Sequence, residues 1–289
     1  MKKMVLAILS VIMVTLLGVM TVGCGKEELN MGKECLKFDL QQTALTQLKE
    51  GTVDVAVIDS VMAGYYTSTD GDFGSLMIVP DLVLAEEQYG IAGRKEDKAL
   101  MSHINQGLIE LYNSGELQHI AERFGLEDIL AINAATVDSF ASESAGDTSF
   151  SEICNRGKIV IGWTDFEPIA FYDDYNNFTG FDTELARAVV NVWNQGSTSI
   201  EIEFYEILDW NTKEALLDAG TIDLIWNGLT ITPERSAEMC ISVPYLYNKQ
   251  VAVIRSEDSQ KYTDKESMSK AVIGVEGGSA GESVVVKKK

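Results

Sequence analysis

Apolar residues follow two alternating patterns along this chain. Short apolar runs rich in β-branched residues predict buried strands, and between them apolar residues recur every three or four positions, which predicts helices with one apolar face. Leu100, Ile104 and Leu108 show the helical spacing, and so does the stretch 185–192. Strands that alternate with helices indicate an α/β fold. The expected strands are 35–38, 53–58, 90–93, 158–163, 200–204, 222–226, 250–254 and 271–275.

Two distant segments repeat one pattern. Leu48-Lys-Glu-Gly51-Thr-Val53-Asp54 matches Leu217-Asp-Ala-Gly220-Thr-Ile222-Asp223 in residue type at nearly every position. In each, we expect the glycine to end a helix in the left-handed conformation and the next apolar residues to enter a buried strand. Any α/β protein can use this device, so the repeat only hints at two similar lobes. The stretch 134–149 is rich in Ser, Ala, Thr and acids without periodicity, which predicts a solvated linker.

Composition excludes several classes of protein. The 289 residues are 46% hydrophobic and 23% charged, as in globular domains rather than disordered or collagen-like chains. With 23 Lys+Arg against 44 Asp+Glu, the formal net charge is -21, so the chain would repel a phosphate backbone and no nucleic-acid partner is expected. Neither a phosphate-binding G-x-x-x-x-G-K-[ST] motif nor an H-E-x-x-H motif occurs. We therefore expect no cofactor and no metal.

The N-terminus has the pattern of an export signal. Lys2 and Lys3 precede an uncharged run, 4–22, that is also long enough to span a membrane. Its end, Thr21-Val-Gly-Cys24, resembles the lipobox of bacterial lipoproteins. That resemblance implies a signal peptide at 1–23, a lipid on the Cys24 thiol and a protein anchored at the outer face of the cell membrane, with residues 24–34 as a tether. An uncleaved signal anchor is the alternative.

The cysteines do not predict a disulfide framework. Removing the signal leaves Cys35, Cys154 and Cys240 beside the lipidated cysteine, and no C-x-x-C pair occurs. An odd number without that spacing argues against both a metal site and a full disulfide set. We expect three buried apolar thiols.

The segment from residue 228 to residue 247 carries the strongest chemical signal. Thr232 followed by Pro233 and Glu234 predicts a helix start, with the threonine as cap and the proline at the first helical position. Arg235 then lies in the first turn, where a cation opposes the helix dipole, so an anionic partner would explain its presence. The alternative is a solvent-exposed arginine.

These motifs resemble a known family, the extracellular solute-binding proteins of family 3, which serve amino-acid importers. Residues 156–247 resemble the opening half of that family, in Arg-Gly-Lys-Ile-Val-Ile-Gly at 156–162, Phe-Glu-Pro at 166–168, Gly-Phe-Asp-Thr-Glu-Leu-Ala at 180–186 and the run 230–245. Residues 44–125 resemble the closing half. The order of the two halves is reversed, which implies a circularly permuted chain whose natural ends are joined by a linker at about 128–149. A truncated tandem of two binding domains is the alternative.

The resemblance implies a two-lobe periplasmic-binding-protein-like fold of type II. One lobe would comprise residues 88–247 and the other residues 35–87 plus 248–289, with the chain crossing between them near 85–88 and 245–249. Closure of the lobes on a ligand is the functional motion of such proteins. The implied partners are an amino-acid ligand, an ABC permease and its ATPase, bound by a monomer.

The resemblance also assigns binding residues. Arg235 and the Thr230 hydroxyl would hold the ligand carboxylate, with Ser279 and the Ala280 amide as further donors. Asp59 and the Gly228 carbonyl would hold the ammonium, although Asp59 fits a helix cap equally well. Phe166 and Trp210 would enclose the apolar stem of the ligand between their rings. Both rings fit core packing as readily.

Two positions bear on specificity. Trp163 stands where some members place an acid that reads basic side chains, which argues against a simple arginine or lysine binder. Glu276 stands where others have lysine or glutamine, so it would accept from a polar side chain or face water. The amino acid itself is not predicted.

Rival functions stay open. Gly277-Gly-Ser279-Ala-Gly281 fits the nucleophile motif G-x-S-x-G, which indicates a serine hydrolase as the runner-up. The histidines, His103 and His119, both precede Ser279, which is not the usual order for such enzymes. A dehydratase and a sensory domain are known on the same fold. We expect a binding protein without catalytic residues.

Overall fold

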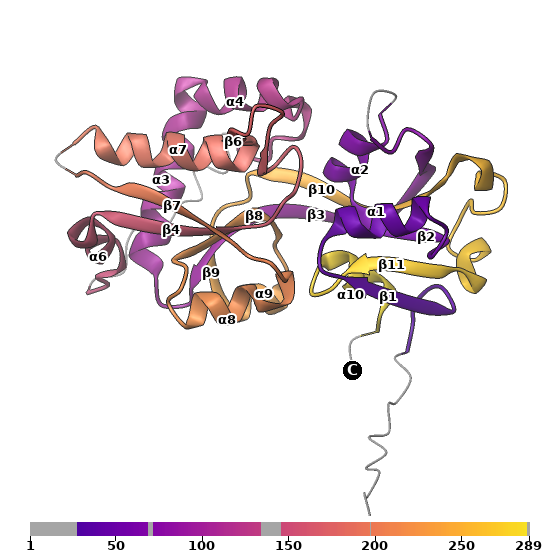
Figure 1. Cartoon of the computed structure of the whole chain (residues 1–289). Helices are drawn as coiled ribbons and strands as arrows, with labels where there is room; N and C mark the ends of the chain where they lie inside the picture. Colours follow the sequence, from indigo (N-terminus) through magenta and orange to yellow (C-terminus); the bar gives the residue numbers. More distant parts are fainter. Residues whose placement is uncertain (1–27, 69–71, 134–145, 197, 288–289) are drawn as a thin grey trace, which may run out of the picture.

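The structure is a computed structural model of the 289-residue chain, and it describes residues 28–68, 72–133, 146–196 and 198–287 (Figure 1). The signal peptide, the Cys24 lipidation site and most of the expected linker lie outside the described residues. Within the described ranges, no helix is both long and apolar enough to cross a membrane.

The described elements form a mixed α/β fold, which confirms the fold class. The strands are β1 (Glu34–Phe38), β2 (Val55–Asp59), β3 (Leu76–Arg94), β4 (Lys158–Trp163), β5 (Phe171–Tyr172), β6 (Phe178–Thr179), β7 (Glu201–Glu206), β8 (Leu224–Thr230), β9 (Met239–Ile241), β10 (Leu246–Arg255) and β11 (Val272–Glu276). The α-helices are α1 (Gln41–Lys49), α2 (Ser60–Tyr66), α3 (Lys98–Ser114), α4 (Glu116–Phe124), α6 (Ser149–Arg156), α7 (Phe181–Asn194), α8 (Lys213–Asp218), α9 (Pro233–Glu238) and α10 (Ala280–Val285). The short 3-10 helices are η1 (Glu127–Ile129), η2 (Trp210–Thr212), η3 (Ser256–Asp258) and η4 (Ser267–Lys270).

One mixed sheet runs through the molecule in the order β1-β11-β2-β10-β3-β8-β4-β7, with β9 paired to β3. The strands at each end of this order pair in parallel, whereas the central pair, β10 and β3, is antiparallel. Figure 1 shows the elements in two groups on either side of that pair. We call them the β2 half (β1, β2, β11, α1, α2, α10) and the β8 half (β4, β7, β8, β9, α3, α4, α6, α7, α8, α9).

The two crossing segments pair with each other. The register of β10 and β3 runs from Leu246 opposite Tyr89 to Gln250 opposite Ala85. The sequence pattern predicts only residues 90–93 of β3 as strand, whereas the strand extends from Leu76 to Arg94. Pro80 and charged residues such as Glu86 interrupt the apolar pattern there, but the backbone pairing with β10 continues past them. The short strands β5, β6 and β9 are likewise not predicted from the pattern.

The sequence repeat is also a structural repeat, because an arginine makes equivalent hydrogen bonds to the repeated segment in each half. At the end of β3, Arg94 Nη1 donates to the carbonyls of Leu217 at 3.3 Å and Ile222 at 3.1 Å. At the end of β10, Arg255 Nη1 donates to the matching carbonyls of Leu48 at 2.9 Å and Val53 at 3.0 Å. Each arginine therefore fastens the far end of a crossing strand to a helix, its turn and the following strand.

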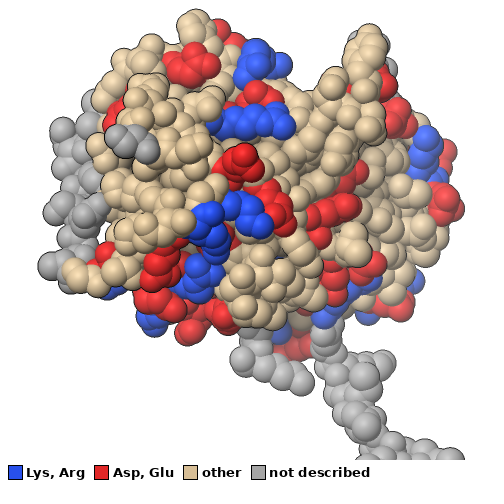
Figure 2. All heavy atoms as spheres, turned by 60° about the vertical axis from the view of Figure 1, so that its left-hand side comes forward, with Lys and Arg blue, Asp and Glu red and all other residues tan. Residues whose placement is uncertain are grey.

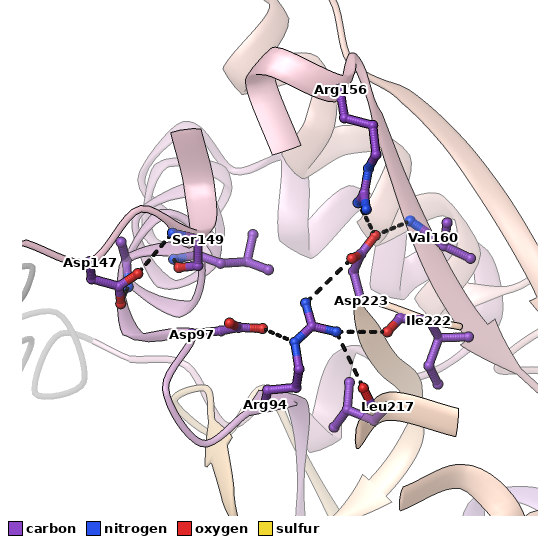
Figure 3. Close-up of polar contacts among 11 residues, drawn as sticks. Arg94, Asp97, Asp147, Ser149, Arg156, Val160, Leu217, Ile222 and Asp223 are labelled. Atoms are coloured by element: carbon purple, nitrogen blue, oxygen red, sulfur yellow. Dashed lines mark hydrogen bonds and ion pairs between the residues drawn. The ribbon is translucent and has the colours of Figure 1, made fainter. Parts of the chain in front are cut away.

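An aspartate completes each of these arginine clamps. Asp223 pairs with Arg94 at 3.5 Å and accepts the Val160 amide at 2.8 Å (Figure 3). Asp54 pairs with Arg255 at 3.7 Å and accepts the Val272 amide at 2.9 Å. The glycines between helix and strand, at 51 and 220, have φ of 83° and 69°, which confirms the expected left-handed turns. The repeat thus joins helix, turn, strand and neighbouring strand in both halves.

The segment that follows the expected linker is bound to the β8 half. Asp147 accepts the Ala99 amide at 2.7 Å, and the Ser149 hydroxyl accepts the Leu100 amide at 2.9 Å, so both cap the first turn of α3 (Figure 3). Helix α6 then begins at Ser149. Residues 147–149 therefore belong to the folded body, and the linker expectation does not extend to them.

The two ends of the described chain lie side by side in the β2 half. The Asn30 amide donates to the Val285 carbonyl at 2.7 Å, and the Lys287 amide donates to the Glu28 carbonyl at 2.8 Å. Figure 1 shows both ends leaving the body at the same place. Residues far apart in sequence thus complete one half.

The cysteines are less buried than the sequence suggests. Cys35, Cys154 and Cys240 are all of intermediate exposure, and no disulfide joins them. They pack at the edges of apolar clusters rather than at their centres. The expectation of fully buried thiols is therefore wrong.

The arginine clamps should be measurable in stability. Replacing Arg94 or Arg255 by Met removes the donor to two carbonyls and the cation that pairs with two aspartates, so each change should lower the free energy of unfolding by about 2–3 kcal/mol. Arg123→Met, at a side chain 56% exposed, is the control and should change it by less than about 1 kcal/mol. Urea unfolding of the three variants makes the comparison. Clamp variants that unfold like the parent would contradict the role we assign.

Candidate functional site

A small cavity, with about 20 Å³ of free space in this arrangement of the halves, lies where the two halves face each other. On the face turned forward in Figure 2, a hollow runs between the halves and acidic side chains lie along it. The structure brings together at the cavity the eight residues predicted to bind ligand, and Glu276 with them. The lining residues are Gln41, Asp59, Met62, Thr164, Asp165, Phe166, Trp210, Asn227, Gly228, Thr230, Arg235, Glu276, Ser279 and Ala280.

Trp163 is not among the lining residues. It is buried behind the cavity, with its ring 4.3 Å from Phe178 and 5.8 Å from Tyr172 between centroids. The structure therefore gives this side chain a packing role.

Arg235 reaches the cavity from the start of α9. The helix begins as predicted, since the Thr232 hydroxyl accepts the Arg235 amide at 3.1 Å and Pro233 is the first helical residue. Its Nη1 donates to the Thr230 carbonyl at 2.8 Å, and its Nη2 donates to the Gly278 carbonyl of the β2 half at 3.1 Å. A guanidinium has five N–H donors, so these bonds leave capacity for an anion. Burial lowers the pKa of Arg235, but the group stays charged.

The Thr230 hydroxyl does not point its proton at the cavity. It donates to Glu87 Oε2 at 3.0 Å. A hydroxyl has one proton, so in this arrangement Thr230 has none to donate to a ligand carboxylate. The expected assistance to Arg235 comes instead from the Thr230 carbonyl, which orients the guanidinium.

Asp59 lies across the cavity at the end of β2. It occupies the cap position of α2, but its side chain makes no cap hydrogen bond, so the helix-cap alternative is wrong. Its carboxyl instead accepts from the side-chain amides of Gln41, Asn248 and Gln250. Burial and the nearby Glu87 carboxylate raise the pKa of Asp59 to about 7. The carboxyl is thus held in place by side-chain amides.

Sequence reasoning missed this amide layer. Asn248 and Gln250 are buried on β10, and Gln41 is buried at the start of α1. Glu87 joins the layer by accepting from Asn248 at 3.1 Å and from Gln250 at 3.0 Å. The sequence signal is two amides at alternate positions of strand β10, which places both side chains on one face of the strand.

Gly228 is fixed at the cavity wall by Asp182. Its φ is 63°, and a Cβ there would lie 2.9 Å from the Phe166 ring, so both conformation and space require glycine. Asp182 Oδ2 accepts the Gly228 amide at 2.8 Å and the Tyr245 hydroxyl at 2.7 Å. Burial raises the pKa of Asp182 to about 7. The aspartate in the Gly-Phe-Asp motif therefore positions the backbone at the site.

The Ser279 hydroxyl forms its hydrogen bonds with backbone groups of neighbouring residues. It caps α10 by accepting the Glu282 amide at 3.1 Å, and it donates to the Glu276 carbonyl at 2.7 Å. The preceding Gly278 has φ of 70°, and a Cβ there would lie 2.7 Å from Asn211 of the β8 half. The glycine turn before α10 is therefore a close contact between the halves.

Glu276 ends β11 and faces the cavity at 5% exposure. Burial and Asp59 raise the pKa of Glu276 to about 8, opposed by Lys213 and Gln41. Phe166 and Trp210 line the same cavity and are both buried. The two rings therefore serve as cavity wall and as core at once.

Asp182 should make stability depend on pH. Its pKa is raised from 3.8 to about 7, so between those values the folded state holds a proton that the unfolded state has lost. Raising the pH from 5 to 8 should therefore lower the free energy of unfolding, and Asp182→Asn should reduce this drop by about 1–3 kcal/mol. Urea unfolding at both pH values measures it, with Asp218→Asn at an exposed position as control. An unchanged drop in the Asp182 variant would contradict the assignment.

One family model matches part of the chain. Residues 159–288 match the model of the bacterial extracellular solute-binding proteins, family 3. The chain is 30% identical over 155 residues to the arginine-binding extracellular protein ArtP of Bacillus subtilis (strain 168), covering 53% of this chain and 57% of the relative. It is 29% identical over 145 residues to a probable histidine-binding protein of Neisseria gonorrhoeae, covering 49% and 51%.

An enzyme also matches. The chain is 29% identical over 140 residues to the membrane-bound lytic murein transglycosylase F of Alcanivorax borkumensis, covering 48% of this chain and 28% of the enzyme. The chain spans about half the length of the two curated binding proteins, and less of the enzyme. Through residues 159–288, the chain is therefore similar to the bacterial extracellular solute-binding proteins, family 3.

Proposed function

We propose that the protein captures an α-amino acid in the cavity between its halves and delivers it to an ABC permease and its ATPase. The observation that carries this proposal is that Arg235 and Asp59, one from each half, line one buried cavity. A guanidinium matches the ligand carboxylate, and an aspartate matches the ammonium. Each charge-assisted contact is worth about 1.5–3 kcal/mol, so a few together support micromolar affinity of about -8 kcal/mol.

The remaining lining residues complete the proposed site. The Gly228 carbonyl is the second acceptor for the ammonium, and Phe166 and Trp210 enclose the apolar stem. Ser279 acts by shaping the turn, because its hydroxyl is already bonded to the Glu276 carbonyl, and the Ala280 amide is the donor that we assign to the ligand.

Closure of two lobes is part of the proposal. The boundaries we propose are residues 35–87 plus 248–289 for one lobe and residues 88–247 for the other, with β3 and β10 as the crossing strands. The contact of Arg235 with Gly278 joins the lobes directly. We further propose a monomer held at the outer face of the membrane by a lipid on Cys24.

A binding role fits this site better than hydrolysis. A serine nucleophile needs a base that takes its proton, but the Ser279 hydroxyl donates to a backbone carbonyl. His119 pairs with Glu122 on the exposed surface of α4, in the other half of the molecule. We therefore propose no catalytic residues.

We also propose that the two family blocks are circularly permuted. The pairing of Asn30 with Val285 places the described ends together, so a chain closed at that point and opened in the linker would keep the same contacts. Termini of compact domains often lie close together, which makes such rearrangements tolerable.

Arg235 should decide ligand affinity. Calorimetry of the purified protein against the twenty amino acids should find at least one that binds with micromolar affinity. Arg235→Ala should weaken it at least a hundredfold, because the carboxylate loses its buried partner at a cost of about 3 kcal/mol. Arg123→Ala, on the exposed surface of α4, should change it less than threefold. Binding of no amino acid, or full affinity after Arg235→Ala, would overturn the proposed function.

The permutation can be tested by restoring the family order. A chain that runs from residue 146 to residue 287, then through a short Gly-Ser linker to residues 28–133, should bind the same ligand within threefold, because the described residues and their contacts are retained. A chain cut within α7 instead should lose binding, since the cut breaks a buried helix. Loss of binding in the first chain would contradict the permutation and favour the tandem alternative.

A further inference from the structure

A turn of two glycines joins the halves beside the cavity. Gly277 and Gly278 follow β11 of the β2 half and lead directly into Ser279 and Ala280, which line the cavity. Figure 1 shows α8 and α9 of the β8 half beside α10, the helix that follows this turn. The turn therefore lies where the halves meet on one side of the cavity.

The glycine turn is fixed within its own half. The Gly277 amide donates to the Phe38 carbonyl of β1 at 2.9 Å, and the Gly278 amide donates to the Glu282 carboxylate of α10 at 2.7 Å. Lys37 pairs with Glu282 at 2.8 Å and holds that carboxylate in place. Both amides are thus bonded inside the β2 half, and the Gly278 carbonyl is directed at the β8 half.

Two cations of the β8 half donate to that one carbonyl. Lys213 Nζ lies 3.2 Å from the Gly278 oxygen, and Arg235 Nη2 lies 3.1 Å from it. A carbonyl oxygen has two lone pairs, so it accepts from both donors. Hydrogen bonds from charged donors are stronger than those between neutral groups. Because these two bonds span the halves, they exist only while the halves are together.

Lys213 is the unusual member of this pair, because its side chain is only 2% exposed and lysine is rarely buried so fully. It also donates to the Trp210 carbonyl at 3.1 Å, lies 4.8 Å from the centroid of the Trp210 ring and pairs with Glu214 at 3.0 Å. Burial and the Arg235 guanidinium lower the pKa of Lys213, whereas Glu214 and Glu276 oppose this effect. The lysine thus connects the Trp210 wall of the cavity to the glycine turn of the other half.

Asn211 packs so closely against the turn that neither glycine can be replaced without displacing it. A Cβ at Gly277 would lie 2.6 Å from Asn211 Nδ2, and a Cβ at Gly278 would lie 2.7 Å from Asn211 Oδ1. Asp209 fixes Asn211 by accepting from its backbone and side-chain amides, both at 3.0 Å. The two halves can therefore approach this closely only because both turn residues are glycine.

Another contact between the halves is more open to water. The rings of Tyr65 and Phe171 lie 6.5 Å apart between centroids, and Tyr65, which also contacts Glu167, is 42% exposed. Polar contacts that water can reach contribute less than buried ones, because the local dielectric is higher. The buried contacts at the glycine turn are therefore better suited to holding the halves together.

Resting on the proposed function, we propose that Gly277 and Gly278, together with Lys213 and Asn211, form a latch that stabilises the closed form, and that Lys213 is its positioning residue. Contacts present in only one of two conformations shift the equilibrium toward that conformation. Lys213 is not among the residues that line the cavity, so it acts through the turn. The latch maintains a closed population without ligand and slows ligand release more than ligand capture.

Small-angle X-ray scattering without added amino acid tests the latch whether or not the protein binds one. Lys213→Met and Gly278→Ala should both shift the radius of gyration to a larger value. Gly51→Ala is the matched control for the second variant, because Gly51 has φ of 83° but nothing lies within 4 Å of its added Cβ. It should keep the radius of the parent. Parent-like radii for both latch variants would overturn the proposal.

A double variant separates a wedge between the halves from damage to the turn itself. Asn211→Ala removes the side chain that the new Cβ of Gly278→Ala would meet. The double variant should therefore have a smaller radius of gyration than Gly278→Ala alone. A radius that stays as large as in Gly278→Ala would contradict the contact we assign to Asn211.

Ligand kinetics then connect the latch to the proposed binding. For an amino acid that calorimetry finds to bind, stopped-flow fluorescence should show koff at least tenfold higher in Lys213→Met, with kon changed less than threefold. Lys158→Met removes an exposed lysine that pairs with Glu203 inside the β8 half, so it should change neither rate. Release at the parent rate from Lys213→Met would contradict the role of Lys213. Binding of no amino acid would overturn the proposed function, and the scattering result would still decide on the latch.

Discussion

The antiparallel pairing of β10 with β3 is the constraint on which the rest of the molecule depends. Their register from Leu246 opposite Tyr89 to Gln250 opposite Ala85 forms the only sheet connection between the strands of the two halves that the structure describes. Strand β3 ends in Arg94 and strand β10 ends in Arg255, and each arginine donates hydrogen bonds to backbone carbonyls of the half that its strand enters. These bonds attach each half to its crossing strand. In the closure that we propose, this strand pair is the hinge between the two halves.

The same strand pair also carries the side-chain amides that hold the acidic groups of the site. Asn248 and Gln250 on β10 orient Asp59 and Glu87, so carboxyls that would otherwise repel one another are held by neutral donors. Burial raises the pKa of Asp59 and Glu276 well above their ordinary values. The cavity is therefore strongly desolvated, so charge contacts formed inside it are stronger than they would be in water.

Local signals predicted much of the fold and the site, and distant contacts account for what they missed. The Thr232-Pro233 cap, the left-handed glycines at 51 and 220 and the helix after Ser279 are all determined within a few residues, and the structure confirms them. The full length of β3 depends on β10, which lies far away in sequence, and the roles of Gln41 and Arg255 depend on strands and helices that only the fold brings near. The direction of the Trp163 side chain is set in the same way, by the rings of Tyr172 and Phe178 against which it packs.

A crystal structure of the protein with a bound amino acid tests the central claim most directly. The account predicts the ligand in the cavity between the halves, with its carboxylate oxygens in hydrogen bonds to the Arg235 guanidinium and its α-ammonium in contact with Asp59. A ligand bound outside this cavity, or bound inside it without contact to both residues, would contradict the account.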